Sequence, residues 1–147
     1  MADAMQNTNF EASELIGTDK VSERVTADIA VGAVGLRAAR IASVMAQIHD
    51  GFAHQQFSTR VVAERLGLSV RYVQDLLQSS GLSITDRIMQ LRLEKARTML
   101  LDDRNCMLKI SDVALSCGFN ELSYFHRSFR RRFGSSPAKF RTNSLNS

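Results

Sequence analysis

Apolar residues recur at three- and four-residue spacing along the chain beyond residue 37, as they do in amphipathic α-helices. The first such stripe ends near Gly51 and consists of Ile41, Val44, Met45, Ile48 and Phe52. Small apolar residues collect from about Thr26, but glycines at positions 32 and 35 weaken a helix there. The first 25 residues are polar and acidic without a sustained period, so we expect a flexible arm.

Two short helices separated by a glycine are predicted between residues 58 and 81. The first has a candidate cap at Ser58 or Thr59 and stops at Gly67, and its buried residues are Val62, Ala63 and Leu66. Ser69 caps the second helix and Gly81 gives it a left-handed exit, and its buried residues are Val73, Leu76 and Leu77. A short helix, a glycine turn and a second helix form a helix-turn-helix.

A longer helix is predicted from Ile84 to Asp102, because Ser83 can cap its start and neither glycine nor proline interrupts it. Its expected buried residues are Ile84, Ile88, Leu91, Ala96 and Leu100. Its expected outward residues are Arg87, Arg92, Lys95 and Arg97. A helix of roughly 20 residues spans about 30 Å, so this element can act as a rigid spacer.

The helix-turn-helix pattern is repeated beyond Asp103, where VALSCGFN matches the earlier VAERLGLS in residue type. The valine-alanine pair and the turn glycine recur 51 residues later as Val113, Ala114 and Gly118. The second turn is one residue longer, and with that insertion Phe125 and Phe129 take the places of the first copy's buried Val73 and Leu77. The second copy ends at Gly134, and a final short helix begins at Ser136 and Pro137 and runs through Phe140.

These elements predict an all-α fold in which two helix-turn-helix units are joined by a long linker helix. The units cover about 59–81 and about 110–133, the linker helix covers about 84–102, and the whole domain covers 37–142. Residues 1–36 form an acidic arm, with Ala27 to Leu36 as a candidate remnant of a preceding domain, and residues 143–147 form a tail.

Composition and charge narrow the class of partner. The 147 residues, 44% apolar and 23% charged, suit one ordinary globular domain. Residues 1–36 carry two bases and six acids, a net charge of −4, whereas residues 37–147 carry 17 bases and nine acids, a net charge of +8. A segment of that charge attracts polyanions, and nucleic acid is the commonest polyanion in the cytoplasm. On charge alone, a solvated basic face carries equal weight.

Other classes find little support in the sequence. The longest uncharged apolar run, Ile29 to Leu36, is eight residues, so no membrane span and no membrane partner are expected. The first 14 residues contain no Lys or Arg and lack the start of a secretory signal, so we expect a cytoplasmic protein. Cys106 and Cys117 have no metal-ligand spacing and are expected to be reduced and structural, with no metal and no cofactor.

An enzyme is not expected either. The motifs GxxxxGK[ST], GxGxxG, HExxH and GxSxG are absent from the sequence. The three histidines, His49, His54 and His126, are scattered without a carboxylate partner that spacing can identify.

The segment ISDVALSCGFNELSYFHRSFRRRFGSSPAKFR, residues 110–141, resembles the signature of the AraC/XylS family of bacterial transcription regulators. The shared pattern comprises an isoleucine, V-A, G-F, a Y-F-x-R-x-F core, F-G and S-P-x-x-F-R. The stretches VVAERLGLSVRYVQDLLQSSG and LRLEKARTMLL are also similar, so the resemblance extends from about Arg37 to Arg141. It implies an all-helical, bi-lobed domain that binds one face of DNA in two successive major grooves and regulates transcription initiation.

Family members usually carry an effector or dimerisation domain ahead of the DNA-binding half. About 36 residues precede it here, too few for such a domain, so we do not expect an effector ligand to bind within this chain. The chain is then a short stand-alone regulator or a fragment of a longer product. Its expected partners are double-stranded promoter or operator DNA and, as a further candidate, RNA polymerase.

The resemblance places the outward side of each second helix against base edges. On the first copy the expected base contacts are Val70, Arg71 and Gln74, with Arg71 suited to guanine and Gln74 to adenine. Asp75 stands where the family more often has a base, and an acid beside phosphates is unfavourable. Arg71 and Gln74 as ordinary surface residues are the alternative.

On the second copy the expected base contacts are Leu122, Ser123, His126 and Arg127. Arg127 matches the arginine that the family has at this place. Leu122 replaces a polar residue, and either touches a thymine methyl group or packs against the neighbouring helix. His126 is a base contact or a solvated side chain with equal weight.

Expected phosphate contacts are Ser69, Lys109, Ser111, Arg130 and Arg131. Residues 130–132 are three consecutive arginines, and a helix turns through about 200° over three residues, so one or two of them can reach the same groove. Two functions from different classes therefore follow from the sequence: a sequence-specific regulator of transcription, or a helical interaction module whose basic surface meets an acidic protein.

Overall fold

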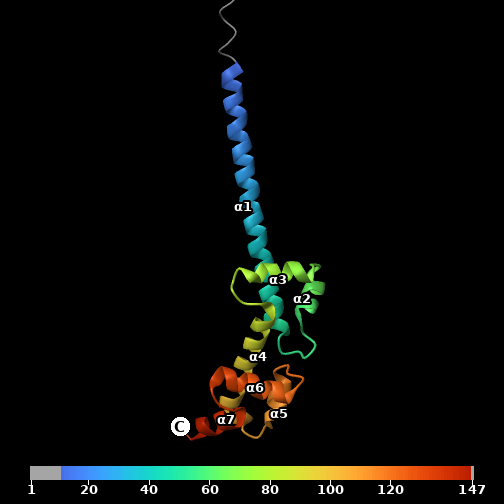
Figure 1. The fold of residues 1–147 in the computed structure, drawn as a ribbon, viewed down its shortest axis with the longest axis vertical. Coiled ribbons are helices and arrows are strands. Elements are labelled where there is room, and N and C mark those ends of the chain that lie inside the picture. Colours follow the sequence, from blue (N-terminus) through green and yellow to red (C-terminus); the bar gives the residue numbers. More distant parts are fainter. Residues whose placement is uncertain (1–10, 147) are drawn as a thin grey trace, which may run out of the picture. The chain divides into compact units, whose positions relative to one another are not determined.

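The computed structural model describes the backbone of residues 11–146 and the side chains of residues 20–146. Within these residues the chain is helical, with short connections (Figure 1). The helices are α1 (Glu11–Gly51), α2 (Thr59–Leu66), α3 (Val70–Gln78), α4 (Ile84–Leu101), α5 (Ile110–Ser116), α6 (Leu122–Phe133) and α7 (Pro137–Leu145), with a 3-10 turn at Asp103–Asn105. The expected all-α class with two helix-turn-helix units is confirmed.

The chain divides into two units, residues 1–40 and residues 41–147. In the first unit, residues 11–40 belong to α1, so the expectation of a flexible arm is wrong for residues 11–25. Residues 1–10 of that arm lie outside the described part of the chain. The reason for the error is that Glu, Ala, Lys and Arg are good helix formers, and a polar helix needs no apolar period.

Residues 20–39 of α1 are exposed, although several of them are large and apolar. Its large apolar side chains are between 52% and 72% exposed, namely Val21, Val25, Ile29, Val31, Val34 and Leu36. By length and composition alone, the helix over Lys20–Gly51 could cross a membrane. The eight-residue uncharged run from the sequence understates this segment, because a helical window of this length and hydropathy includes Arg37 and Arg40. The absence of a membrane span stays a prediction.

The second unit has a core made of two clusters among its described residues. The last turns of α1 pack with α2, α3 and the start of α4 around the fully buried Val44, Ile48, Val62 and Val73. The second half of α4 packs with α5 and α6 around Leu93, Ala96, Val113, Phe125 and Phe129. Each cluster thus serves one helix-turn-helix unit, and α4 contributes to both.

Helix α4 follows the prediction in its bounds but not in all of its faces. Leu91 is half-buried against the first cluster, and Leu93 is buried as well, because the side of α4 that is covered changes from the first cluster to the second. Arg92 does not face outward: its guanidinium lies half-buried against the loop after α1, and this burial lowers its pKa. Cys117 is buried as expected, whereas Cys106 is exposed and not part of the core.

Helix ends agree with the caps that the sequence suggests at several places. Ser83 Oγ accepts a hydrogen bond from the Asp86 amide at 3.1 Å, and Ser136 Oγ accepts one from the Lys139 amide at 3.3 Å. Ser58 is the residue before α2 but makes no side-chain cap hydrogen bond. Helix α7 continues past Phe140 to Leu145, so most of the expected tail is helical.

Candidate nucleic-acid interface

Helix α3 is fixed by its inner face and its cap, which leaves the other face open. Val73, Leu76 and Leu77 are buried in the first cluster. Ser69 Oγ accepts a hydrogen bond from the Tyr72 amide at 3.1 Å, which satisfies one of the orphan donors at the helix start. The residues expected to contact bases lie on the surface, with Val70 39% exposed and Arg71 and Gln74 also exposed.

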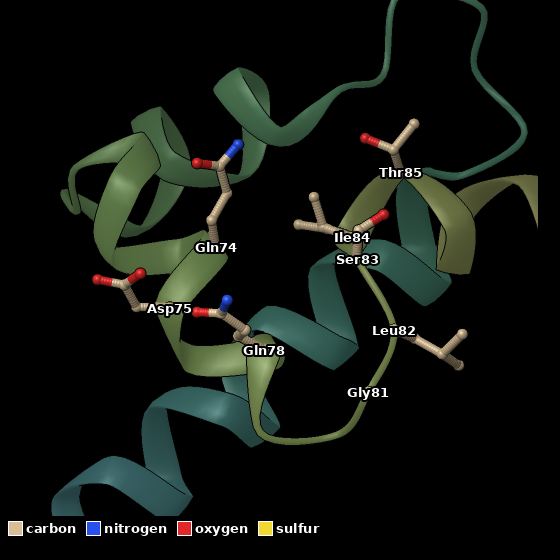
Figure 2. A pocket seen from close by; sticks show the side chains of 8 residues that line it. All are labelled: Gln74, Asp75, Gln78, Gly81, Leu82, Ser83, Ile84 and Thr85. Atoms are coloured by element: carbon tan, nitrogen blue, oxygen red, sulfur yellow. The ribbon is translucent and has the colours of Figure 1, made fainter.

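Gln78 is a further exposed residue of α3, beyond those expected to contact bases. It stands four residues after Gln74, the spacing at which side chains share one face of a helix. Figure 2 shows Gln74, Asp75 and Gln78 along α3, beside the segment Gly81–Thr85. They line a surface hollow of about 530 Å³ between α3 and the start of α4. The signal that could have identified Gln78 is this four-residue spacing.

Helix α6 is anchored by aromatic rings. Phe125 and Phe129 are fully buried, with their ring centroids 5.6 Å apart. Phe129 also contacts Phe133 at 4.6 Å and, edge to face, Phe140 of α7 at 5.4 Å. Because aromatic contacts of this kind fix the rotation of a helix about its axis, they decide which of its side chains reach solvent.

Most expected contact residues of α6 lie on that open side. Leu122 is 43% exposed and Arg127 is exposed. Ser123 is exposed too, but its hydroxyl donates a hydrogen bond to the Glu121 carboxylate. His126 is half-buried, with its ring edge against Phe125 at 5.8 Å.

The three consecutive arginines of α6 do not share one environment. Arg132 points its Nη2 to the Glu94 carboxylate of α4 at 3.5 Å. Arg130 and Arg131 are exposed, and both follow Arg127 along the helix. Arg132 is therefore directed toward α4, and which of the three arginines reach a groove stays a prediction.

The remaining expected phosphate contacts lie at the start of α5. Lys109 is the residue that precedes this helix, and Ser111 is in its first turn. Both side chains are exposed, and Asp112 beside them is an acid in the same turn. The arrangement can offer one ammonium and one hydroxyl to an anion.

Charge is distributed unequally between the two exposed helices. Helix α6 carries four arginines and no acid, whereas α3 carries one arginine, Arg71, and one acid, Asp75. The exposed surface of α6 is therefore more basic than that of α3. No group of three His, Cys, Asp or Glu side chains that could hold a metal ion occurs among the described residues.

Comparison with known proteins identifies similar chains. The helix-turn-helix domain family matches residues 62–143. The chain is 32% identical over 102 residues to the transcriptional activator RhrA of Rhizobium meliloti, covering 69% of this chain and 32% of that protein. It is 36% identical over 104 residues to the HTH-type transcriptional activator RhaS of Escherichia fergusonii, covering 70% and 36%. The chain thus spans about a third of the length of these relatives.

A solved structure with a similar fold contains DNA. It is the crystal structure of the DNA-binding domain of AdpA, a global transcriptional factor, in complex with a target DNA. The TM-score is 0.60 with 27% sequence identity, and the match covers 70% of this chain and 90% of that domain.

Proposed function

Because the chain belongs to the AraC/XylS family of helix-turn-helix DNA-binding domains, we propose that it is a sequence-specific regulator of transcription. It binds double-stranded promoter or operator DNA from one face and places α3 and α6 in two successive major grooves. The similar relatives RhrA and RhaS are transcriptional activators, which favours activation, with RNA polymerase as the further partner. The site of action is the bacterial cytoplasm.

The observation that carries this proposal is the repeat of one arrangement in two places. Each unit buries one face of its second helix in a hydrophobic cluster and leaves the opposite face exposed. An exposed helix face of this size fits the major groove, which is about 12 Å wide. One such unit is common in proteins, but two on a segment with 17 bases and nine acids are matched to a duplex.

The two helices have different tasks in this proposal. On α6, Arg127 donates to base edges while Arg130 and Arg131 bind phosphates, aided by Lys109 and Ser111 at the start of α5. Leu122 contacts a thymine methyl group, and Ser123 and His126 contribute polar contacts. This helix supplies most of the electrostatic affinity because it carries four arginines and no acid.

Helix α3 adds selectivity with less charge. Arg71 and Gln74 offer the donor and acceptor groups that suit guanine and adenine, and Val70 offers an apolar contact. Ser69 combines its cap with a phosphate contact, since its oxygen accepts from the Tyr72 amide and its proton remains for donation. Asp75 lowers the affinity of α3 for phosphate, so that binding by this helix depends on base contacts.

The experiment that tests the proposal is a selection of bound sequences from a random duplex pool, followed by salt titrations. Binding of the selected duplex is measured against a shuffled duplex of the same composition. A regulator binds the selected duplex at least about 10³-fold more tightly, and both affinities fall steeply as salt rises. Equal affinity for both duplexes, or failure of the selection to converge, overturns sequence-specific recognition and leaves an interaction module for an acidic protein.

A further inference from the structure

Helix α4 changes partners near its middle, where Leu91 packs on the first cluster and Met89 and Leu93 pack on the second. Its first half contributes Ile84 and Ile88 to the first cluster, and its second half contributes Leu93, Ala96 and Leu100 to the second. Arg92 lies at this boundary, between residues that pack on the two different clusters. The two helix-turn-helix units therefore have separate apolar cores, and their relative orientation must be fixed by something other than a shared core.

The Arg92 guanidinium binds the loop that connects α1 and α2. Its Nε donates to the Phe52 carbonyl at 2.7 Å, and its Nη2 donates to the His54 carbonyl at 2.9 Å. Two short hydrogen bonds from one planar group fix direction as well as distance. The rings of Phe52 and Phe57 in this loop pack in the first cluster. Arg92 therefore holds the first helix-turn-helix to the middle of the linker helix.

The second helix-turn-helix contacts the Arg92 side chain and the loop after α1 through Gly118. A Cβ atom added there would lie 2.8 Å from Arg92 Nε and 2.9 Å from the Ala53 carbonyl oxygen. The turn of the second helix-turn-helix thus rests directly on the arginine and on the loop of the first. Lys95 reinforces this contact, because its Nζ donates to the Ser116 carbonyl at 2.9 Å, two residues before Gly118.

The internal repeat provides a comparison for this glycine. Gly67 is the equivalent turn residue of the first unit, and both glycines have positive φ, +64° and +93°. A Cβ atom at Gly67 would have nothing within 4 Å. Conformation alone therefore explains Gly67, whereas Gly118 is also required for the close approach of the two units.

We propose that Arg92, Gly118 and the carbonyl groups of residues 52–54 form a clasp that fixes the angle between the two helix-turn-helix units. The clasp makes Arg92 a positioning residue for DNA binding, because it restricts the protein to one spacing between the two recognition elements. This inference rests on the proposed function. A shift of one base pair moves an element by about 3.4 Å along the duplex, which a fixed angle cannot follow.

The test measures affinity over a series of duplexes in which the spacing between the two selected elements changes one base pair at a time. The affinity of the wild type should fall about tenfold or more when the spacing differs by one base pair from the best one. This is the loss expected for one base contact. The affinity of Arg92→Ala should fall less than about threefold at that spacing, because its two helix-turn-helix units can change their relative angle. Arg92→Lys keeps the charge but not the planar fork, and should also show the broadened profile.

Gly118→Ala and Gly67→Ala form the matched pair. Both substitutions impose the strain of an alanine at positive φ, but Gly118→Ala alone forces a Cβ between Arg92 and Ala53. Gly118→Ala should therefore shift or broaden the spacing profile, while Gly67→Ala keeps the profile of the wild type. Unchanged profiles for folded Arg92→Lys and Gly118→Ala overturn the clasp.

A measurement without DNA separates this inference from the proposed function. Spin labels on cysteines at the exposed Arg60 of α2 and Asp112 of α5, in a Cys106→Ser background, report the distance between the units. A narrow distance distribution that broadens with Arg92→Lys supports the clasp even where sequence-specific binding is absent. The same width in both proteins overturns the clasp even where DNA binding is selective.

Discussion

Arg132 of α6 points its guanidinium at the Glu94 carboxylate of α4, with 3.5 Å between Nη2 and Oε1. Both side chains are half-exposed, so this ion pair contributes little to stability. Its consequence is directional. It turns one arginine of the consecutive run toward the linker helix and leaves Arg130 and Arg131 as the residues that can reach phosphate oxygens.

Arg131→Ala should lower affinity for all DNA sequences alike and make the dependence of log K on log salt shallower by about one unit. The reason is that one phosphate contact releases about one counterion. Arg132→Ala is the matched control, since it removes the same charge from an adjacent residue that faces Glu94. Equal salt slopes for Arg131→Ala and the wild type would show that Arg131 does not contact the backbone, and Arg130→Ala would then be measured.

Arg127→Ala should weaken binding to the selected duplex by about 1 to 3 kcal/mol and relax the preference at one base position. Arg127 is exposed on α6, one turn before Arg130 and Arg131, on a helix whose rotation is fixed by Phe125 and Phe129. Repeating the sequence selection with the variant identifies the affected position. If every position keeps its preference, Arg127 does not read a base.

The cap of α3 gives a prediction for stability. Ser69→Ala removes the acceptor of the Tyr72 amide and should lower the free energy of unfolding by about 1 kcal/mol. Ser58→Ala is the control, because Ser58 occupies the same place before α2 but makes no side-chain cap hydrogen bond. Chemical denaturation of both variants measures the difference. A Ser58→Ala loss as large as that of Ser69→Ala would mean that the two hydroxyls do not differ as the structure indicates.

The two cysteines should differ in reactivity. Burial raises the pKa of the Cys117 thiol to about 11, and its Sγ lies 3.8 Å from the sulfur of Met99. Since the thiolate is the reactive form, an alkylating reagent at pH 8 should modify the exposed Cys106 and leave Cys117 intact. Mass spectrometry should detect one label in buffer and two in denaturant. Rapid double labelling in buffer contradicts the burial of Cys117.

The same burial has a consequence for stability at high pH. A folded-state pKa raised above the usual 9.0 means that the neutral thiol favours the folded state. This contribution is present below pH 9 and is lost as the pH rises from 9 toward 11. Cys117→Ala should therefore reduce the loss of unfolding free energy between these pH values, as urea denaturation would measure.

The sequence predicts the helices of residues 41–147 well, because the signals for these helices are local. Apolar spacing, the caps Ser69, Ser83 and Ser136, and the turn glycines each act within a few residues. The repeat adds long-range information, since two similar units must bury similar faces. Phe125 and Phe129 were placed in the core in this way, by analogy with Val73 and Leu77.

Features that depend on packing between distant segments could not be predicted. Arg92 has the sequence context of an outward-facing base, and its partners lie 38 and 40 residues away in the chain. Gly118 and Gly67 look equivalent in the repeat. An added Cβ atom would meet Arg92 and Ala53 at Gly118, but nothing within 4 Å at Gly67. The DNA contacts of α3 and α6 remain predictions, because exposure permits a contact without specifying a base.

The protein should bind as a monomer to a non-palindromic site with two elements about one helical turn, 10 to 10.5 base pairs, apart. Helix α4 is 18 residues without a break, which corresponds to about 27 Å, comparable with the roughly 34 Å repeat of B-DNA. The two heads differ in sequence, with Arg71 and Gln74 on α3 and Ser123, His126 and Arg127 on α6. The two elements should differ accordingly, so one chain gives no reason for a palindrome.

Inserting five base pairs between the elements places them on opposite faces of the duplex, and affinity should fall to that of one element alone. Inserting ten base pairs returns both elements to the same face of the duplex but moves them about 34 Å further apart. Helix α4 cannot span that distance, so the affinity should fall equally. A flexible linker would tolerate the ten-base-pair insertion and not the five. Sedimentation of the complex gives the number of chains bound. Two chains on a palindrome, or unchanged binding after the five-base-pair insertion, would show that the two heads do not act as one rigid monomer.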